Sequence, residues 1–223
     1  MGGGVIRTME RADTVFVVDD DALLRKALKL FLQAEGFDVE TYASATAFLD
    51  ACQADWRGCV ILDIGMPGMD GLALQQALSE RGVRLPVIFL TGQGDIPKTV
   101  QAMKGGAVDF LEKPASDAEI LGRVQAAMAH EAKCRQAAQR RLKVKNRFER
   151  LTPRERKVMS LLVSGMTNKE VARKLEISFR TVEVHRSRIM EKMAAESILE
   201  LIEMARAGGV FEKPRGPKRG RGA

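Results

Sequence analysis

Aspartates close two of the apolar runs in this sequence. Residues 15–18 are followed at once by Asp19, Asp20 and Asp21, and a second run ends on Asp63. Like charges placed this closely repel one another unless a cation relieves them. Because the C-terminal ends of parallel strands meet at one edge of a sheet, where ligands bind, we expect the two groups to lie together. The pattern indicates an oxygen-rich pocket for a hard cation, built around a reactive aspartate.

Two further apolar runs end on side chains suited to a phosphoryl group. Thr91 offers a hydroxyl and Lys113 an ammonium, and both groups can stabilise a phosphoryl oxygen. Asp20, Asp63 and a backbone carbonyl after Asp63 would supply the oxygen ligands that Mg²⁺ prefers. Such an ion would neutralise charge while a phosphoryl group moves to Asp63. Each residue alone is typical of a turn or a cap, but their occurrence at four strand ends favours a phosphoryl-accepting site.

The elements that must position these side chains alternate along the first half of the chain. Apolar runs typical of strands are followed each time by helical patterns, which predicts an α/β domain with a five-stranded parallel sheet and helices on both faces. Helix caps support the pattern, since Ser44 precedes one helix and Ser116 with Glu119 forms a capping box before another. The candidate strands are 14–18, 37–42, 59–62, 86–90 and 107–111, and the candidate helices are 22–35, 44–54, 70–80, 96–105 and 116–130.

Charge is distributed unevenly over the 223 residues. Residues 13–130 carry 10 Lys or Arg against 17 Asp or Glu, whereas residues 131–223 carry 24 against 11. A basic half of this kind is typical of a surface that faces a polyanion. No apolar stretch approaches the ~20 residues of a membrane span, no secretion signal is evident, and the three cysteines lack metal-ligand spacing. We therefore expect a cytoplasmic protein of two domains without a membrane partner.

The second half is all-helical in pattern. Over residues 151–209, Thr152 and Thr167 open two helices with capping boxes, Ser178 caps a third, and a fourth covers 196–207. The short connection between the second and third helices is typical of a helix-turn-helix.

A connector and two tails complete the predicted organisation. Residues 131–150 are rich in Lys, Arg, Gln and Ala and predict a helical linker. The apolar seam that leads into it, through Val124 and Leu142, is broken by Glu131 and Arg135, so the pattern does not establish a stable coiled coil. The tails, residues 1–12 and 210–223, have compositions that predict disorder.

The third helix of the basic domain has two contrasting stripes. Val182, Ile189 and Met193 share one stripe and are expected in the core, which leaves the opposite stripe free to enter a DNA major groove. His185 is expected either to pack at the helix edge or to donate to a phosphate. The candidate DNA contacts are Lys169, Arg180, Thr181, Glu183, Val184, Arg186, Ser187, Arg188 and Lys192.

Four motifs in order, residues 17–21, 62–71, Thr91-Gly92 and Lys113-Pro114, resemble the receiver domain of two-component response regulators. The resemblance covers residues 13–130 and implies a flavodoxin-like sheet of order 2-1-3-4-5. It implies that a sensor histidine kinase phosphorylates the protein and that Asp21 caps a helix instead of binding metal. The site residues that it implies are Asp63 as phosphoacceptor, Asp19, Asp20, Asp63 and the Gly65 carbonyl for Mg²⁺, Thr91 and Lys113 for the phosphoryl group, and Phe110 as aromatic switch.

Residues 151–209 are similar to the LuxR-type helix-turn-helix. A receiver joined to this module resembles the FixJ/NarL family of transcriptional regulators, and the pattern here is nearer to FixJ. The resemblance implies that phosphorylation promotes homodimerisation and sequence-specific binding to promoter DNA, with RNA polymerase as a further partner. The last helix, with Leu199, Ile202 and Ala205 on one stripe, is expected either to form the dimer contact or to pack within its own domain.

Two alternatives use the same residues. An aspartyl-phosphate hydrolase would need a general acid two residues after Asp63, where Gly65 has no side chain. A receiver whose helix-turn-helix binds a protein would lack the steep salt dependence of phosphate contacts. A response regulator promotes its own phosphorylation and dephosphorylation but is not a turnover enzyme, and we expect that behaviour here.

Overall fold

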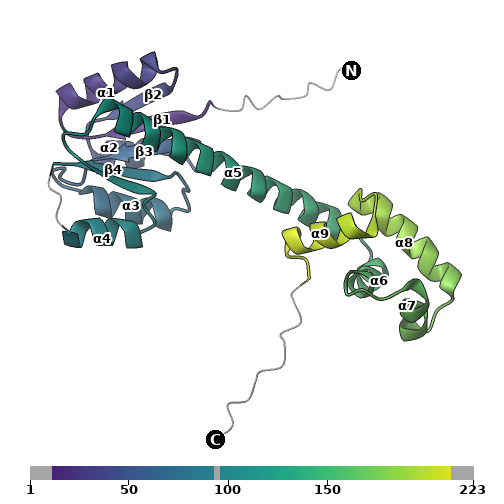
Figure 1. Ribbon diagram of the computed structural model, residues 1–223. Coiled ribbons are helices and arrows are strands. Elements are labelled where there is room, and N and C mark those ends of the chain that lie inside the picture. The colour runs from purple at the N-terminus through teal and green to yellow at the C-terminus, as the bar shows by residue number, and fades with distance from the viewer. Residues whose placement is uncertain (1–11, 93–95, 212–223) are drawn as a thin grey trace, which may run out of the picture. The chain divides into compact units, whose positions relative to one another are not determined.

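The structure is a computed structural model that describes residues 12–92 and 96–211, and contacts divide the chain near Cys134 into two compact units (Figure 1). The tails predicted at 1–12 and 210–223 lie almost wholly outside the described residues. Within the described ranges, no helix is both long and apolar enough to span a membrane.

The first unit is an α/β domain, as predicted. Its single parallel sheet has the order β2-β1-β3-β4-β5, with one helix after each strand. Every predicted strand and helix is present within a few residues of its expected ends, except that the last helix continues through the predicted linker. The elements are β1 (Thr14–Val18), α1 (Ala22–Ala34), β2 (Asp38–Tyr42), α2 (Ala45–Ala51), β3 (Gly58–Leu62), α3 (Gly71–Glu80), β4 (Val87–Thr91), α4 (Ile96–Lys104), β5 (Asp109–Glu112) and α5 (Asp117–Glu149).

The strand register brings four strand ends to one edge. Val18 pairs with the last residue of β3, so the residues that follow, Asp19 and Asp63, are neighbours across the sheet. The amide of Asp63 donates to the carbonyl of Val18 over 2.9 Å. At the next pair of strands, the amide of Lys113 donates to the carbonyl of Thr91 over 2.8 Å. The hydrogen-bond ladder therefore continues past the strand ends. It fixes the backbone positions of Asp19, Asp63, Thr91 and Lys113.

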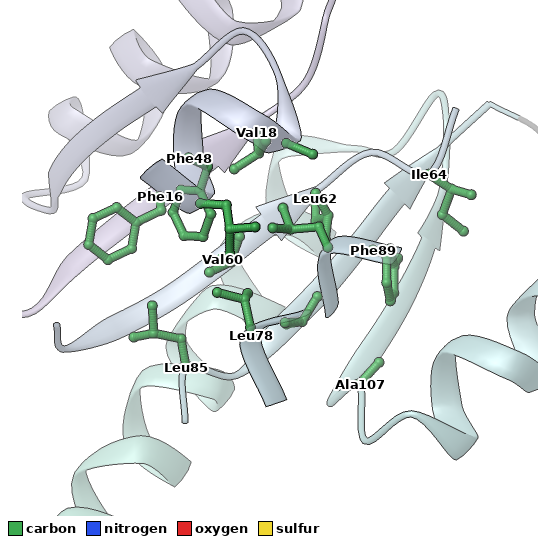
Figure 2. Packing of buried hydrophobic residues seen from close by; sticks show 14 of the residues in the cluster. Phe16, Val18, Phe48, Val60, Leu62, Ile64, Leu78, Leu85, Phe89 and Ala107 are labelled. Atoms are coloured by element: carbon green, nitrogen blue, oxygen red, sulfur yellow. The ribbon is translucent and has the colours of Figure 1, made fainter. Parts of the chain in front are cut away.

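Helices cover both faces of the sheet. On one face, β1, β3 and β4 meet α2 and α3, where Phe16, Phe48 and Phe89 are fully buried (Figure 2). On the other face, alternate strand residues such as Val17 meet α1 and the first part of α5, where Val124 is fully buried. Burying one such side chain contributes about 1.5–3 kcal/mol. The two-sided core therefore holds the strand ends in fixed positions.

The second unit is all-helical, and its helices begin at the predicted caps. Thr152 and Thr167 each complete a capping box with a glutamate three residues later. Ser178 accepts a hydrogen bond at the start of the third helix, and Gly209 ends the fourth with a φ of 62°. The helices are α6 (Pro153–Val163), α7 (Asn168–Leu175), α8 (Phe179–Met193) and α9 (Ile198–Gly208).

The C-terminal part of α5 belongs to this second core. Val144 is 6% exposed and packs there, with Phe148 beside it. The guanidinium of Arg147 donates to the carbonyl of Met193, at the end of α8, over 3.0 Å. Leu142, which lies on the interrupted apolar seam, is 58% exposed. Val144 is buried in its place, and Phe148, four residues further along the helix, is partly buried, because the two positions share the face that meets this core.

Candidate functional site

Lys113 joins two of the predicted carboxylates. Its ammonium lies 2.6 Å from Oδ2 of Asp19 and 3.0 Å from Oδ1 of Asp63. Only 3% of Asp19 and 6% of Asp63 is exposed, and Thr91, which ends β4, is 2% exposed. The structure therefore gathers three of the predicted side chains in direct contact at the sheet edge where Thr91 also lies.

Asp63 is held from two sides. Its Oδ2 accepts a hydrogen bond from the amide of Gly65 over 2.8 Å, while Oδ1 faces Lys113. A Cβ atom at Gly71, where α3 begins, would overlap the carbonyl of Asp63, so glycine is needed for the helix to start this close. A Cβ atom at Gly65 would lie 3.4 Å from Oδ2. A side chain at this position would therefore lie next to the carboxylate, and glycine leaves that space open.

The acidic residues in the loop between β1 and α1 have different roles. Oδ1 of Asp19 accepts a hydrogen bond from the amide of Asp21 over 2.8 Å. Asp21 caps α1, as predicted, by accepting from the amides of Leu24 and Leu23. Those two bonds lower the pKa of Asp21 below its ordinary value. Asp19 thus points into the pocket, while Asp21 is committed to the helix.

Asp20 and Arg25 complete this loop. Asp20 is exposed, and no described residue forms a hydrogen bond or ion pair with its carboxylate. Arg25, in the first turn of α1, donates from Nη1 to the backbone carbonyl of Asp19 over 2.6 Å. The sequence argument missed Arg25. The only signal for Arg25 was its position one helical turn after the cap Asp21, and that position alone does not indicate a bond to the backbone.

The ammonium of Lys113 remains charged at neutral pH. Burial alone would lower the pKa of Lys113, but hydrogen bonds to Asp19 and Asp63 and the attraction of their charges outweigh it and raise the pKa. The predicted switch residue, Phe110 on β5, is partly buried and packs against the core beneath the sheet.

The donor set at this edge is compatible with Mg²⁺. Within the described ranges, the structure gathers no group of three acidic, histidine or cysteine side chains of the kind that makes a complete metal site. Mg²⁺ does not require one, because it commonly binds through one or two carboxylates and keeps several waters. A carboxylate has about four lone-pair sites. Asp19 and Asp63 therefore retain acceptor capacity beyond their bonds to Lys113 and to the backbone.

The two stripes predicted on α8 are confirmed as a buried face and an exposed face. Val182, Ile189 and Met193 are fully buried. Val184 is 44% exposed on the opposite face. The other candidate DNA contacts that are exposed are Lys169, Arg180, Thr181, Glu183, Ser187 and Arg188.

Two of the candidate DNA contacts are engaged inside the unit. The ammonium of Lys192 lies 2.7 Å from Oε2 of Glu155, a residue of α6 that is 2% exposed. Arg186 is partly buried, and its Nη1 lies 3.5 Å from Oδ1 of Asn168 on α7. Lys192 comes near the helix end, where the register turns its side chain toward the start of α6. A helical-wheel argument without the position of α6 could not separate it from the exposed stripe.

The residues for which the sequence left two alternatives, His185 and the stripe on α9, lie at the edge of the core. His185 is partly buried, and its Nδ1 is buried without a hydrogen-bond partner among the described residues. On α9, Ala205 is 1% exposed and packs internally, whereas Leu199 is 64% exposed and Ile202 is partly buried. The stripe predicted on α9 is therefore divided between the core and the surface.

Comparisons with known proteins agree with both units. Residues 15–125 match the response regulator receiver domain, and residues 149–205 match the luxR family of bacterial regulatory proteins. The transcriptional regulatory protein FixJ of Azorhizobium caulinodans is 45% identical over 196 residues, which are 88% of this chain and 93% of that protein. Nodulation protein W of Bradyrhizobium diazoefficiens is 42% identical over 196 residues, covering 88% and 86% of the two chains. The solved structure of the response regulator StyR superposes with a TM-score of 0.80 at 39% identity, covering 88% of this chain and 99% of that one.

Proposed function

This chain belongs to the two-component response regulators that join a receiver domain to a LuxR-type DNA-binding domain, and we propose that phosphorylation of Asp63 is its switch. It is a transcriptional regulator and not a classical turnover enzyme, and its two domains imply a kinase partner and promoter DNA. The observation that carries the proposal is the bridge from Lys113 to Asp19 and Asp63. The ammonium of Lys113 offsets the repulsion between the two buried carboxylates and lies against Asp63, the nucleophile of the proposed reaction.

The proposed transfer uses the side chains at the strand ends. An oxygen of Asp63 bonds to phosphorus as the bond between phosphorus and the kinase histidine nitrogen breaks, and the electron pair leaves with the histidine. Lys113, charged and within reach of Asp63, neutralises the new negative charge, and the hydroxyl of Thr91 donates to a phosphoryl oxygen. We propose that Phe110, which contacts the core, then changes position in response to the phosphoryl group.

Asp19, Asp20, Asp63 and the carbonyl of Gly65 are the residues that we propose to hold Mg²⁺. When bound, the ion supplies charge neutralisation at the phosphoryl oxygens. The chain itself orients Asp63 through the amide of Gly65 and leaves the space above Oδ2 open. Open space beside the carboxylate also admits water, so we propose that the chain promotes hydrolysis of its own acyl phosphate.

Replacement of Asp63 with asparagine tests the assignment. The full chain is incubated with acetyl phosphate and Mg²⁺, and the acyl phosphate is detected by intact-mass spectrometry as a phosphate adduct that hydroxylamine removes. We expect the adduct in the wild type and none in Asp63→Asn. Asp70→Asn is the matched control, because Asp70 caps α3 nearby and asparagine is an equally good cap. Persistence of an adduct at this site in Asp63→Asn would refute the assignment.

For the second unit we propose contact with promoter DNA through the exposed face of α8. Six candidate contacts on α7 and α8 besides Val184 are exposed there, and a helix face of this kind fits a major groove. We leave Lys192 out of the proposed contacts because Glu155 binds its ammonium. Arg186 stays in the set as a side chain that is shared with Asn168.

The finer partners and limits are also proposals. We propose homodimerisation on phosphorylation or DNA binding, supported by the exposed Leu199 of α9, together with contact to RNA polymerase and a cytoplasmic location. We propose a receiver at 13–130 and a DNA-binding domain at 151–209. The burial of Val144 in the second core supports extending the DNA-binding domain back into the linker at 131–150.

A further inference from the structure

Arg25 holds the backbone of the acidic loop from the helix that follows it. Its guanidinium turns back from α1 and donates to the carbonyl of Asp19 over 2.6 Å, in a partly buried position. Asp19 is otherwise held by its side chain, through Lys113 and the amide of Asp21, and by its own amide, which donates to the carbonyl of Tyr42 over 3.2 Å. The bond from Arg25 is therefore the contact that fixes the carbonyl between Asp19 and Asp20.

That carbonyl determines where Asp20 points. The carbonyl of Asp19 and the amide of Asp20 belong to one planar peptide unit, so holding the oxygen sets the orientation of the plane from which Asp20 begins. The carboxylate of Asp20 is exposed and, among the described residues, has no partner of its own. Its direction therefore depends on the backbone, unlike the directions of Asp19 and Asp63, which are fixed by bonds to their own oxygens.

We propose that Arg25 is a positioning residue for cation binding, which holds the peptide between Asp19 and Asp20 so that the carboxylate of Asp20 faces the pocket. The inference rests on the proposed function, because it takes this pocket as the Mg²⁺ site. Arg25 binds neither the ion nor the phosphoryl group in this role. It acts through Asp20 alone.

The role makes a prediction whose sign differs from that of simple electrostatics. If Arg25 acted only through its charge, it would repel Mg²⁺, and removing it would strengthen Mg²⁺ binding. A positioning Arg25 has the opposite effect, because losing the residue that orients a ligand typically lowers metal affinity about 10–100-fold. The direction of change therefore separates the two roles.

The test is an Mg²⁺ titration of the full chain, followed by amide chemical shifts of the loops at Asp19 and Asp63. We expect Arg25→Gln to raise the Kd for Mg²⁺ about tenfold. Arg25→Lys keeps the charge with a poorer hydrogen-bond geometry and should fall between wild type and Arg25→Gln. Lys26→Gln is the matched control, since Lys26 is the exposed next residue and its loss removes the same charge. An unchanged or lower Kd in Arg25→Gln would overturn the proposal.

A double-mutant cycle shows whether Arg25 acts through Asp20. Asp20→Asn should itself weaken Mg²⁺ binding, and adding Arg25→Gln should then weaken it no further. A full additional loss in the double variant would place the effect of Arg25 elsewhere and overturn the inference. Wild-type chain that shows no Mg²⁺-dependent shifts at these loops would instead remove the proposed function. The melting temperature without Mg²⁺ is measured for each variant, and Arg25→Lys serves for the comparison if Arg25→Gln does not fold.

Discussion

Replacing Lys192 with glutamine tests whether this side chain stabilises the DNA-binding unit or contacts DNA. Its ammonium lies 2.7 Å from Glu155, and the two side chains are 34% and 3% exposed. Removing one partner of a buried pair costs about 3–5 kcal/mol. Because Lys192 is partly solvated and Thr152 still donates to the same carboxylate, we expect a loss of about 2 kcal/mol. For a unit of this size, the melting temperature should fall by roughly 10 °C.

Thermal unfolding of the full chain by circular dichroism measures the fall, and the salt dependence of DNA affinity measures phosphate contacts. We expect Lys192→Gln to lower the melting transition of the second unit and to leave the salt slope unchanged. Adding Glu155→Gln should recover part of the loss, because no buried charge is then left unpaired. Lys157→Gln, an exposed lysine of α6, is the control. An unchanged melting temperature with a salt slope reduced by about one unit would return Lys192 to the DNA contacts.

Three further predictions concern the second unit. Arg188→Ala should weaken promoter binding and reduce the salt slope by about 0.9, and unchanged affinity at moderate salt would exclude Arg188 from the interface. Burial alone would raise the pKa of Glu155, but hydrogen bonds from Lys192 and the α6 cap hold the pKa below its ordinary 4.5. The stability that this carboxylate contributes is therefore complete above pH 4.5 and is lost as the pH falls through the lower folded-state pKa. Acid titration of the unfolding free energy should show a weaker pH dependence in Glu155→Gln, and an identical dependence would contradict the assignment. Val144→Ala should cost about 2 kcal/mol, whereas Leu142→Ala should change stability by less than about 0.5 kcal/mol, and equal losses in urea unfolding would place Val144 outside the core.

The strands, helices and caps were predictable because their signals are local. A strand buried on both faces is apolar along its length, as β3 is and as β4 is up to its last residue, Thr91. A capping box needs only two side chains three residues apart. The meeting of Asp19, Asp63 and Lys113 was predictable for a related reason. In a parallel sheet, strand ends fall at one edge, so a residue just after a strand has a known place before any tertiary contact is known.

The contacts that sequence reasoning missed depend on how whole helices are placed. Leu142 and Val144 are both apolar, and only the positions of α6 and α9 make one exposed and the other buried. Lys192 looks like a surface lysine until the start of α6, with Glu155, lies beside it. Arg25 donates to a backbone carbonyl, and a bond to the backbone leaves no mark on the identity of the residue that accepts it.

The pocket of the receiver is held together by a cation that the chain supplies itself, and this determines how folding depends on metal. In a structural zinc site, the ligands come together only with the ion, so chelation unfolds the protein. Here Lys113 already neutralises repulsion between Asp19 and Asp63, and backbone amides hold both carboxylates. We therefore expect EDTA to leave the receiver folded with an unchanged melting temperature. Mg²⁺ at ten times its Kd should add only about 1.4 kcal/mol through binding. A receiver that loses its near-ultraviolet circular dichroism in EDTA would show that Lys113 does not stabilise the two carboxylates in the way the distances indicate.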